Sequence, residues 1–330
     1  MKIKKILIKG LYGEFNFNWE LNSTVNILSG INGSYKTTLL RMIRTLCMAR
    51  LLHDICDVEF AEISFSDSVS LKYKSFNDNL LKLKELSSSD DMLSRIALDM
   101  KADIDGIDDA HLAERKLAAD IIGISKKDSD ISIKDFKNSI KVDYISTFDV
   151  PEIIEKKERR SYLDRKLDDL ERDYAYYLSD LSKTLLDNIN SGRQMDKSIA
   201  KEIFAQRDMF LSIVQNAFSE TGKRIDGDKS RLEFVLNNGK VIHFEALSSG
   251  EKQFLIIMLT ALLERKEEFI FLLDEPEISM HYEWQIKLIE NILKLNPHCQ
   301  LVLTTHSPAM IMDGWEQAVT NVGTIKVNNG

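Results

Sequence analysis

The chain has 330 residues, of which 44% are hydrophobic and 29% are charged, and its formal net charge is -8. This composition excludes a disordered chain and suffices for one large α/β domain or two smaller ones. With 4 prolines and 14 glycines, it favours helices over an all-β fold. The negative charge opposes nonspecific attraction to nucleic acid, although a local basic face is still compatible with it.

The sequence also bears on location and metal binding. Cys47, Cys56 and Cys299 are unclustered, which predicts neither a disulfide framework nor a zinc site. No stretch approaches the roughly 20 apolar residues needed to cross a bilayer, and the N-terminal segment has no small-residue cleavage site. We therefore expect a cytoplasmic protein without a membrane partner.

The N-terminal part alternates apolar and polar residues, a pattern typical of strands. Strands are expected over residues 2–10, 14–21 and 24–28. The third is apolar and ends just before Gly30, and the apolar spacing after it predicts a helix from Lys36 to Leu52. Residues 58–65 and 69–73 alternate again and predict a hairpin near a sheet edge.

Two insertions are predicted in the middle of the chain. Residues 76–137 are polar and rich in Ser and Asp, which predicts a helical insertion, whereas residues 138–150 resume strand character and return to the first domain. Residues 151–225 predict a short antiparallel, coiled-coil-like helical arm. Its seam is expected to comprise Leu163, Leu167, Leu170, Tyr174, Tyr177, Leu181 and Leu185. The remaining segments, residues 1–75 and 226–330, are expected to form one head domain.

The segment GINGSYKTT at residues 30–38 has the pattern of a phosphate-binding loop. Such a loop needs glycines where the backbone turns tightly, followed by Lys and Ser or Thr at the start of a helix. Gly30, Gly33, Lys36 and Thr37 meet this requirement. Lys36 would reach the β- and γ-phosphates of ATP, and the Thr37 hydroxyl would ligate Mg²⁺. The alternative is a strand-to-helix turn that binds nothing.

One position departs from this pattern, because Tyr35 replaces the glycine expected before the lysine. A bulky residue is strained in a left-handed backbone conformation and would crowd the phosphates. We therefore expect a re-shaped loop or slower hydrolysis.

Two further motifs follow apolar strands near the C-terminal end. FIFLLDEPE presents Asp274, which would hold Mg²⁺ through water, and Glu275, which would polarise the attacking water. In TTHSP, His306 would donate a hydrogen bond to the γ-phosphate and orient that water. The alternatives are a structural carboxylate pair before Pro276 and a structurally satisfied histidine.

The segment LSSGEKQ precedes an apolar helix. Ser248, Ser249 and the Gly250 amide would lie at a helix N-terminus that attracts anions. A plain N-cap, with Glu251 completing a capping box, would explain the same residues.

Together these segments resemble the ABC-type ATPases of the SMC, RecF and OLD group. GINGSYKTTLL is similar to GxNGSGKTTLL of that group, LSSGEKQ to its signature, and DEPEISMHYEWQ to its DEPExxLHPxxQ stretch. The chain is most similar to the compact ATPases of bacterial anti-phage systems such as Septu and PARIS. The resemblance implies an α/β P-loop NTPase of the ABC-ATPase head type, with a mixed sheet and helical insertions.

The resemblance also implies a site shared between two copies. One copy would bind ATP and Mg²⁺, and the other would close over the γ-phosphate with its signature. The nucleotide-binding residues would be Gly30, Asn32, Gly33, Ser34, Tyr35, Lys36, Thr37 and Thr38, with Ser248, Ser249 and Gly250 from the second copy. Lys36, Glu275 and His306 would be catalytic, Thr37 and Asp274 would hold the metal, and Ser279–His281 would form an inter-subunit loop. Met280 and Tyr282 depart from the family pattern, and no Gln-loop residue is evident.

Three functions remain open at this point. The first is a dimeric ATPase that regulates a separate effector, such as a nuclease, in phage defence; the chain ends soon after His306, which leaves no room for an appended nuclease. The second is a DNA-repair ATPase whose arm holds DNA through Lys156, Lys157, Arg159 and Arg160, although these basic residues are interleaved with Glu155 and Glu158. The third is a hydrolysis-poor scaffold in which Tyr35 stops turnover.

Overall fold

A five-stranded parallel sheet forms the centre of the molecule in a computed structural model, which describes residues 1–53, 55–75, 121–126, 129–146, 161–191, 197–227, 229–312 and 314–327. Its strands, in spatial order, are β14 (Val319–Asn321), β3 (Val25–Ser29), β13 (Gln300–Thr304), β12 (Ile270–Asp274) and β8 (Val142–Ser146). All neighbouring pairs are parallel. The segments that follow β3, β12 and β13 therefore emerge at the same edge, where ligands bind in such sheets.

A seven-stranded antiparallel sheet lies beside it. Its strands, in spatial order, are β15 (Lys326–Val327), β2 (Phe15–Glu20), β1 (Ile3–Leu11), β4 (Phe60–Phe65), β5 (Val69–Lys74), β6 (Ile121–Lys126) and β7 (Ser129–Asp130). The buried amide of Gln300 joins the two sheets, since it exchanges hydrogen bonds of 2.7 Å with both backbone groups of Ile3. The expected α/β architecture is thus confirmed, with parallel and antiparallel strands in separate sheets.

The hairpin of β4 and β5 lies near one edge of this sheet but does not form the edge itself. Strand β6 covers the outer side of β5 over six residue pairs, from Val69 opposite Lys126 to Lys74 opposite Ile121. Residues 121–126 fall in the range 76–137, for which the sequence predicts a helical insertion. Helix α4 (Ile133–Ser139) begins in that range and ends two residues beyond it, whereas residues 76–120 lie outside the described part of the chain. Pairing with a distant strand decided the conformation of β6, and local composition does not report such pairing.

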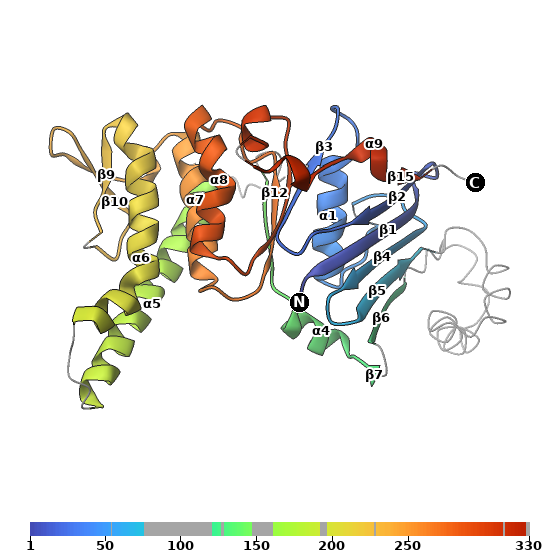
Figure 1. Cartoon of the computed structure of the whole chain (residues 1–330), viewed down its shortest axis with the longest axis horizontal. Coiled ribbons are helices and arrows are strands. Elements are labelled where there is room, and N and C mark those ends of the chain that lie inside the picture. The colour runs from blue at the N-terminus through green and yellow to red at the C-terminus, as the bar shows by residue number, and fades with distance from the viewer. Residues whose placement is uncertain are drawn as a thin grey trace, which may run out of the picture.

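Helix α1 (Lys36–Cys47) lies between the parallel and the antiparallel sheet, whereas α7 (Ser249–Leu263) and α8 (Tyr282–Leu295) lie on the other side of β12 (Figure 1). The strand β12 separates two cores by its alternation: Ile270 and Leu272 belong to the core around α1, and Phe271 and Leu273 to the core around α7. Helix α1 ends before the expected Leu52, because Ala49 adopts a left-handed conformation with φ 46°.

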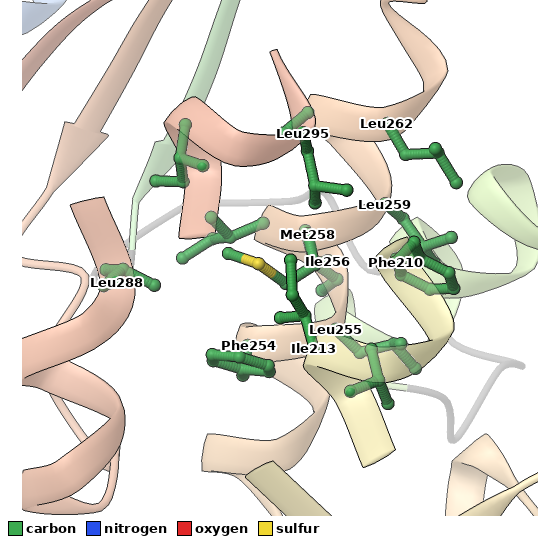
Figure 2. Close-up of a cluster of buried hydrophobic side chains, with 14 of the residues drawn as sticks. Phe210, Ile213, Phe254, Leu255, Ile256, Met258, Leu259, Leu262, Leu288 and Leu295 are labelled. Carbon is green, nitrogen blue, oxygen red and sulfur yellow. The ribbon is translucent and has the colours of Figure 1, made fainter. Parts of the chain in front are cut away.

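Helix α7 (Ser249–Leu263) is buried from Gly250 to Leu262. Helices α5 (Tyr162–Asn190), α6 (Lys197–Phe218) and α8 (Tyr282–Leu295) pack around it. Figure 2 shows part of the resulting core, in which Phe254, Met258 and Leu259 of α7 lie among side chains such as Phe210 and Leu288. A helix that is apolar on all sides requires such a covering.

Only the outer part of the predicted helical arm projects from the head domain. Leu167, Leu170, Tyr174 and Tyr177 of its expected seam are buried in the same core as α7, so the N-terminal half of α5 belongs to the head. The C-terminal part of α5 and the start of α6 project from the molecule (Figure 1). A salt bridge of 2.6 Å between Lys252 of α7 and Asp164 of α5 adds to this attachment. Residues 192–196, between the helices, lie outside the described part of the chain.

A three-stranded antiparallel sheet lies beyond α6. It consists of β11 (Val241–His243), β10 (Glu233–Leu236) and β9 (Lys223–Ile225), in this order. A tight turn joins β10 and β11, where Gly239 has φ 80°. A short helix α9 (Val322–Ile325) precedes β15. In the residues described, no helix combines the length and hydropathy that a bilayer crossing requires.

Candidate nucleotide-binding site

The loop between β3 and α1 has the backbone of a phosphate cradle. Gly30 has φ 157° and Gly33 has φ 78°, conformations that residues with a side chain rarely adopt. A β-carbon at residue 30 would also lie only 2.8 Å from the Ser34 hydroxyl oxygen. That hydroxyl is buried and has no hydrogen-bond partner among the described residues. Asn32 and Gly33 are exposed, so the loop presents its backbone outward and fits an anionic ligand.

Tyr35 takes the left-handed conformation that a glycine would adopt, with φ 70° and ψ 16°. Its ring lies against two aromatic rings of the β1–β2 turn region: the centroid of Phe15 is 4.8 Å away and that of Tyr12 is 5.7 Å away. The structure thus has the expected backbone strain, and aromatic packing compensates for it.

This balance predicts an unusual order of stabilities for substitutions at Tyr35. We expect Tyr35→Ala to be less stable than Tyr35→Gly by about 1 kcal/mol, because alanine keeps the left-handed strain and loses the ring contacts. Urea unfolding of both variants and the wild type measures the difference. An alanine variant as stable as the glycine variant would contradict the assigned backbone conformation.

Three charged or titratable side chains from different motifs meet beyond the loop. The Lys36 Nζ lies 2.7 Å from the His306 Nε2, and the same imidazole nitrogen lies 3.2 Å from the Glu275 Oε1. The Lys36 ammonium can only donate and the Glu275 carboxylate can only accept, so the imidazole cannot satisfy both at once. The His306 Nε2 therefore has two alternative partners, and the tautomer of the imidazole selects between them.

Lys36 is 5% exposed, and its ammonium donates to the carbonyl oxygens of Gly30 at 3.0 Å and Ile31 at 3.3 Å. Burial lowers the pKa of Lys36, and the nearby carboxylates, Glu275 first among them, oppose that shift. A polyanion in the cradle would stabilise the charged ammonium further.

Asp274 lies at the end of β12 and faces the start of α1. Its Oδ1 accepts hydrogen bonds from the hydroxyls of Thr37 at 3.1 Å and Thr304 at 2.6 Å, and its Oδ2 accepts one from the Tyr144 hydroxyl at 3.3 Å. Thr37 and Asp274 thus offer adjacent oxygen donors, which suit Mg²⁺. Among the described residues no cluster of three or more His, Cys, Asp or Glu side chains could hold a metal alone. Mg²⁺ usually takes one or two protein ligands and completes its shell with phosphate and water.

The structure adds residues that the sequence analysis did not assign to the site. Glu277 is 8% exposed, and its Oε1 accepts from the Thr305 hydroxyl at 2.6 Å, the His306 amide at 2.8 Å and the Ser307 amide at 3.2 Å. Glu277 thus fixes the backbone that carries His306. Gln285 and Tyr144 are two further site residues that the sequence did not predict. The signal for Glu277 and Gln285 lay in the DEPE segment and the final Gln of DEPEISMHYEWQ, but no local pattern indicates what either one contacts.

The start of α7 has the capping box that was the structural alternative for LSSGEKQ. The Ser248 hydroxyl accepts from the Glu251 amide at 3.3 Å, and the Glu251 carboxylate accepts from the Ser248 amide at 2.9 Å. Burial raises the pKa of Glu251, but hydrogen bonds, from Lys223 first and then from Ser248, outweigh it and lower the pKa overall. Ser248 and Ser249 are exposed, whereas Gly250 is buried.

The fold therefore brings most, but not all, of the predicted site residues together. Lys36, Thr37, Asp274, Glu275 and His306 are joined by the contacts given above. The side-chain contacts of Ser248, in contrast, lie within its own capping box.

Gly250 is packed directly on the expected inter-subunit loop. A β-carbon at this position would lie 2.0 Å from the carbonyl oxygen of Ser279, which itself has φ 67°. Any side chain at residue 250 would displace this loop.

Comparison with known proteins agrees with this geometry. Residues 25–313 match the AAA_21 family, described as "AAA domain, putative AbiEii toxin, Type IV TA system". The chain belongs to the AAA_21 family. The match includes the cradle, α7, β12 and His306, so the residues brought together in the structure all lie within the AAA_21 domain.

More specific similarities extend over different parts of the chain. The Septu protein PtuA of Bacillus thuringiensis is 29% identical over 189 residues, which are 48% of this chain and 47% of that protein. The AAA_21 chain thus spans about half the length of this curated relative. Among solved structures, the SMC head domain from Thermotoga maritima has a TM-score of 0.49 at 12% identity and covers 97% of this chain and 94% of its own. An Smc head domain from Pyrococcus furiosus has a TM-score of 0.44, also at 12% identity, with 94% and 91% covered.

Proposed function

We propose that this chain is an ATPase that binds ATP with Mg²⁺, dimerises around it, and regulates a separate effector in anti-phage defence. The convergence of Lys36, Glu275 and His306 at one edge of the parallel sheet carries the proposal. These residues come from three motifs, and the contacts of 2.7 and 3.2 Å leave one imidazole shared between a cation and a carboxylate. Membership of an ATPase domain family supports the same activity.

In this proposal each side chain has a role that its position permits. The Lys36 ammonium exchanges its two carbonyl partners and its contact with the His306 Nε2 for phosphate oxygens, so that the imidazole nitrogen becomes free. The Glu275 carboxylate accepts a proton from the attacking water while the bond between the γ-phosphorus and the bridging oxygen breaks. Thr37 and Asp274 would hold Mg²⁺, which neutralises phosphate charge when bound.

Dimerisation is proposed because the signature residues are placed for an external ligand. Ser248 and Ser249 are exposed at the N-terminus of a buried 15-residue helix, where backbone amides and the helix dipole favour an anion. A second copy that supplies the phosphates would use both features. The effector role rests on the resemblance to ATPases of anti-phage systems and on the partial similarity to the Septu protein PtuA. We propose a nuclease as the effector.

A mixing experiment tests whether the site is shared. Lys36→Ala removes the cradle cation, and Ser249→Asp adds a negative charge beside the proposed γ-phosphate position. Asp is favourable in the first helical turn, so the second variant keeps the helix start intact. We expect each variant alone to be inactive and an equimolar mixture to show about a quarter of wild-type hydrolysis. Half of the randomly mixed dimers contain both variants, and each of these has one intact site of two.

The mixture is compared with each variant at the same total concentration. If the wild type hydrolyses ATP and the mixture does not, the shared site is contradicted. Activity of Ser249→Asp alone would remove the signature from the mechanism.

A further inference from the structure

The amide of Gln285 links two loops that are separate in sequence. Its Nε2 donates to the carbonyl oxygen of Met280 at 3.0 Å, and its Oε1 accepts from the hydroxyl of Ser307 at 2.6 Å. Met280 lies in the loop Ser279–His281, and Ser307 directly follows His306. One side chain from the first turns of α8 therefore fixes the distance between the Ser279–His281 loop and the histidine backbone.

The other contacts of Ser307 fix the direction of its hydrogen bond to Gln285. The Ser307 hydroxyl accepts from the Ala309 amide at 3.2 Å, so its single proton is available for Gln285. The Ser307 amide donates to Glu277 and to the Thr305 hydroxyl, at 3.2 and 2.9 Å. The segment that carries His306 is thus held from two sides, by Glu277 and by Gln285.

The Ser279–His281 loop in turn packs against the start of α7, which is the helix that begins within LSSGEKQ and is called the signature helix below. Gly250 leaves no space for a side chain against the Ser279 carbonyl oxygen, and the Met280 amide donates to the Glu277 carbonyl oxygen at 2.9 Å. Close-packed contacts of this kind transmit a displacement. A shift of the signature or of this loop therefore reaches Ser307 through the Gln285 amide.

We propose that Gln285 is a positioning residue for His306, which makes ATP hydrolysis depend on the position of the Ser279–His281 loop. This inference rests on the proposed function, in which that loop lies at the dimer interface. When a second copy engages the loop, Met280 and Gln285 hold Ser307, and His306 faces the γ-phosphate. Without the amide link, His306 loses its fixed distance from Lys36 and Glu275.

Three substitutions test the link: one removes both of its hydrogen bonds, and the other two each remove one end. Gln285→Met keeps the side-chain length and removes both hydrogen bonds. Gln285→Glu keeps the acceptor for Ser307 but cannot donate to the Met280 carbonyl. Lys287→Met, an exposed position on the same helix, serves as the matched control. Ser307→Ala removes the opposite partner without changing α8.

We expect both Gln285 variants and Ser307→Ala to lower kcat about tenfold or more, with the Kd for ATP changed less than about twofold, because small misplacements of catalytic groups reduce rate more than binding. Gln285→Met with Ser307→Ala should lose no more than either alone. In a His306→Ala background, Gln285→Met should cause no further loss. Steady-state hydrolysis and titration with a fluorescent ATP analogue measure these values.

Several results would overturn the inference while leaving the ATPase proposal intact. Wild-type kcat in Gln285→Met would do so. Wild-type kcat in Gln285→Glu would show that Met280 plays no part. An equal further loss in the His306→Ala background would place the effect elsewhere. A wild type that binds no ATP or does not hydrolyse it would instead remove the proposed function and this inference together.

Discussion

Replacing Glu275 by glutamine is expected to lower ATP hydrolysis by about 10²- to 10⁴-fold, the usual contribution of a general base. The side-chain amide of glutamine cannot accept a proton from water, but it has the size of the carboxylate. Glu275 has φ 48°, and its backbone amide donates to the Thr304 hydroxyl at 3.0 Å and to the Thr304 carbonyl oxygen at 3.2 Å. The backbone that presents the side chain therefore does not depend on its charge.

The same variant is expected to remain dimeric in ATP. Since the substitution stops hydrolysis and leaves Lys36 and Thr37 in place, bound ATP persists and the closed dimer accumulates. Phosphate release and light scattering after size exclusion measure the two effects. Glu283→Gln, an exposed glutamate in the first turn of α8, is the control. Hydrolysis within about twofold of the wild type would exclude Glu275 as the base, and a monomer in ATP would contradict the proposed dimer.

The second large effect is expected at Lys36. Lys36→Ala should weaken ATP binding at least about hundredfold, or about 3 kcal/mol, since a buried ammonium that bonds to phosphate contributes a charge-assisted hydrogen bond. Lys36 is the cation at the centre of the site, and burial already lowers its pKa. Titration with a fluorescent ATP analogue measures the loss.

Lys36→Met distinguishes lost charge from lost packing, because methionine keeps an apolar side chain of similar length. We expect the two variants to bind ATP equally poorly. The partly exposed Lys5 on β1, remote from the cradle in sequence, provides a control, and Lys5→Ala should bind as the wild type does. If Lys36→Met retained wild-type affinity, the cradle would not use the ammonium, and the assignment of the P-loop would fail.

Much of the site was predictable because its motifs are local. The glycines of the cradle follow from the turn between an apolar strand and a helix, and the structure gives Gly30 and Gly33 the positive φ that this interpretation requires. The capping box of Ser248 and Glu251, the structural alternative for LSSGEKQ, lies within four residues and is present. Parallel strands β3, β12 and β13 then bring their carboxyl ends together, so the order of motifs indicated which residues meet.

Other features were decided by contacts between distant residues. The sequence alone determined the P-loop, the buried signature helix and the α/β class, since each depends on neighbouring residues and their spacing. Only the tertiary structure placed β6 beside β5, packed the seam of α5 against α7, turned the Tyr35 ring onto Phe15, and joined Gln285 to Ser307. These depend on backbone pairing and side-chain bonds across 20 or more residues, as the register of β5 with β6 and the pair Gln285–Ser307 illustrate. Local periodicity reports which face of an element is apolar, but not which surface will cover it.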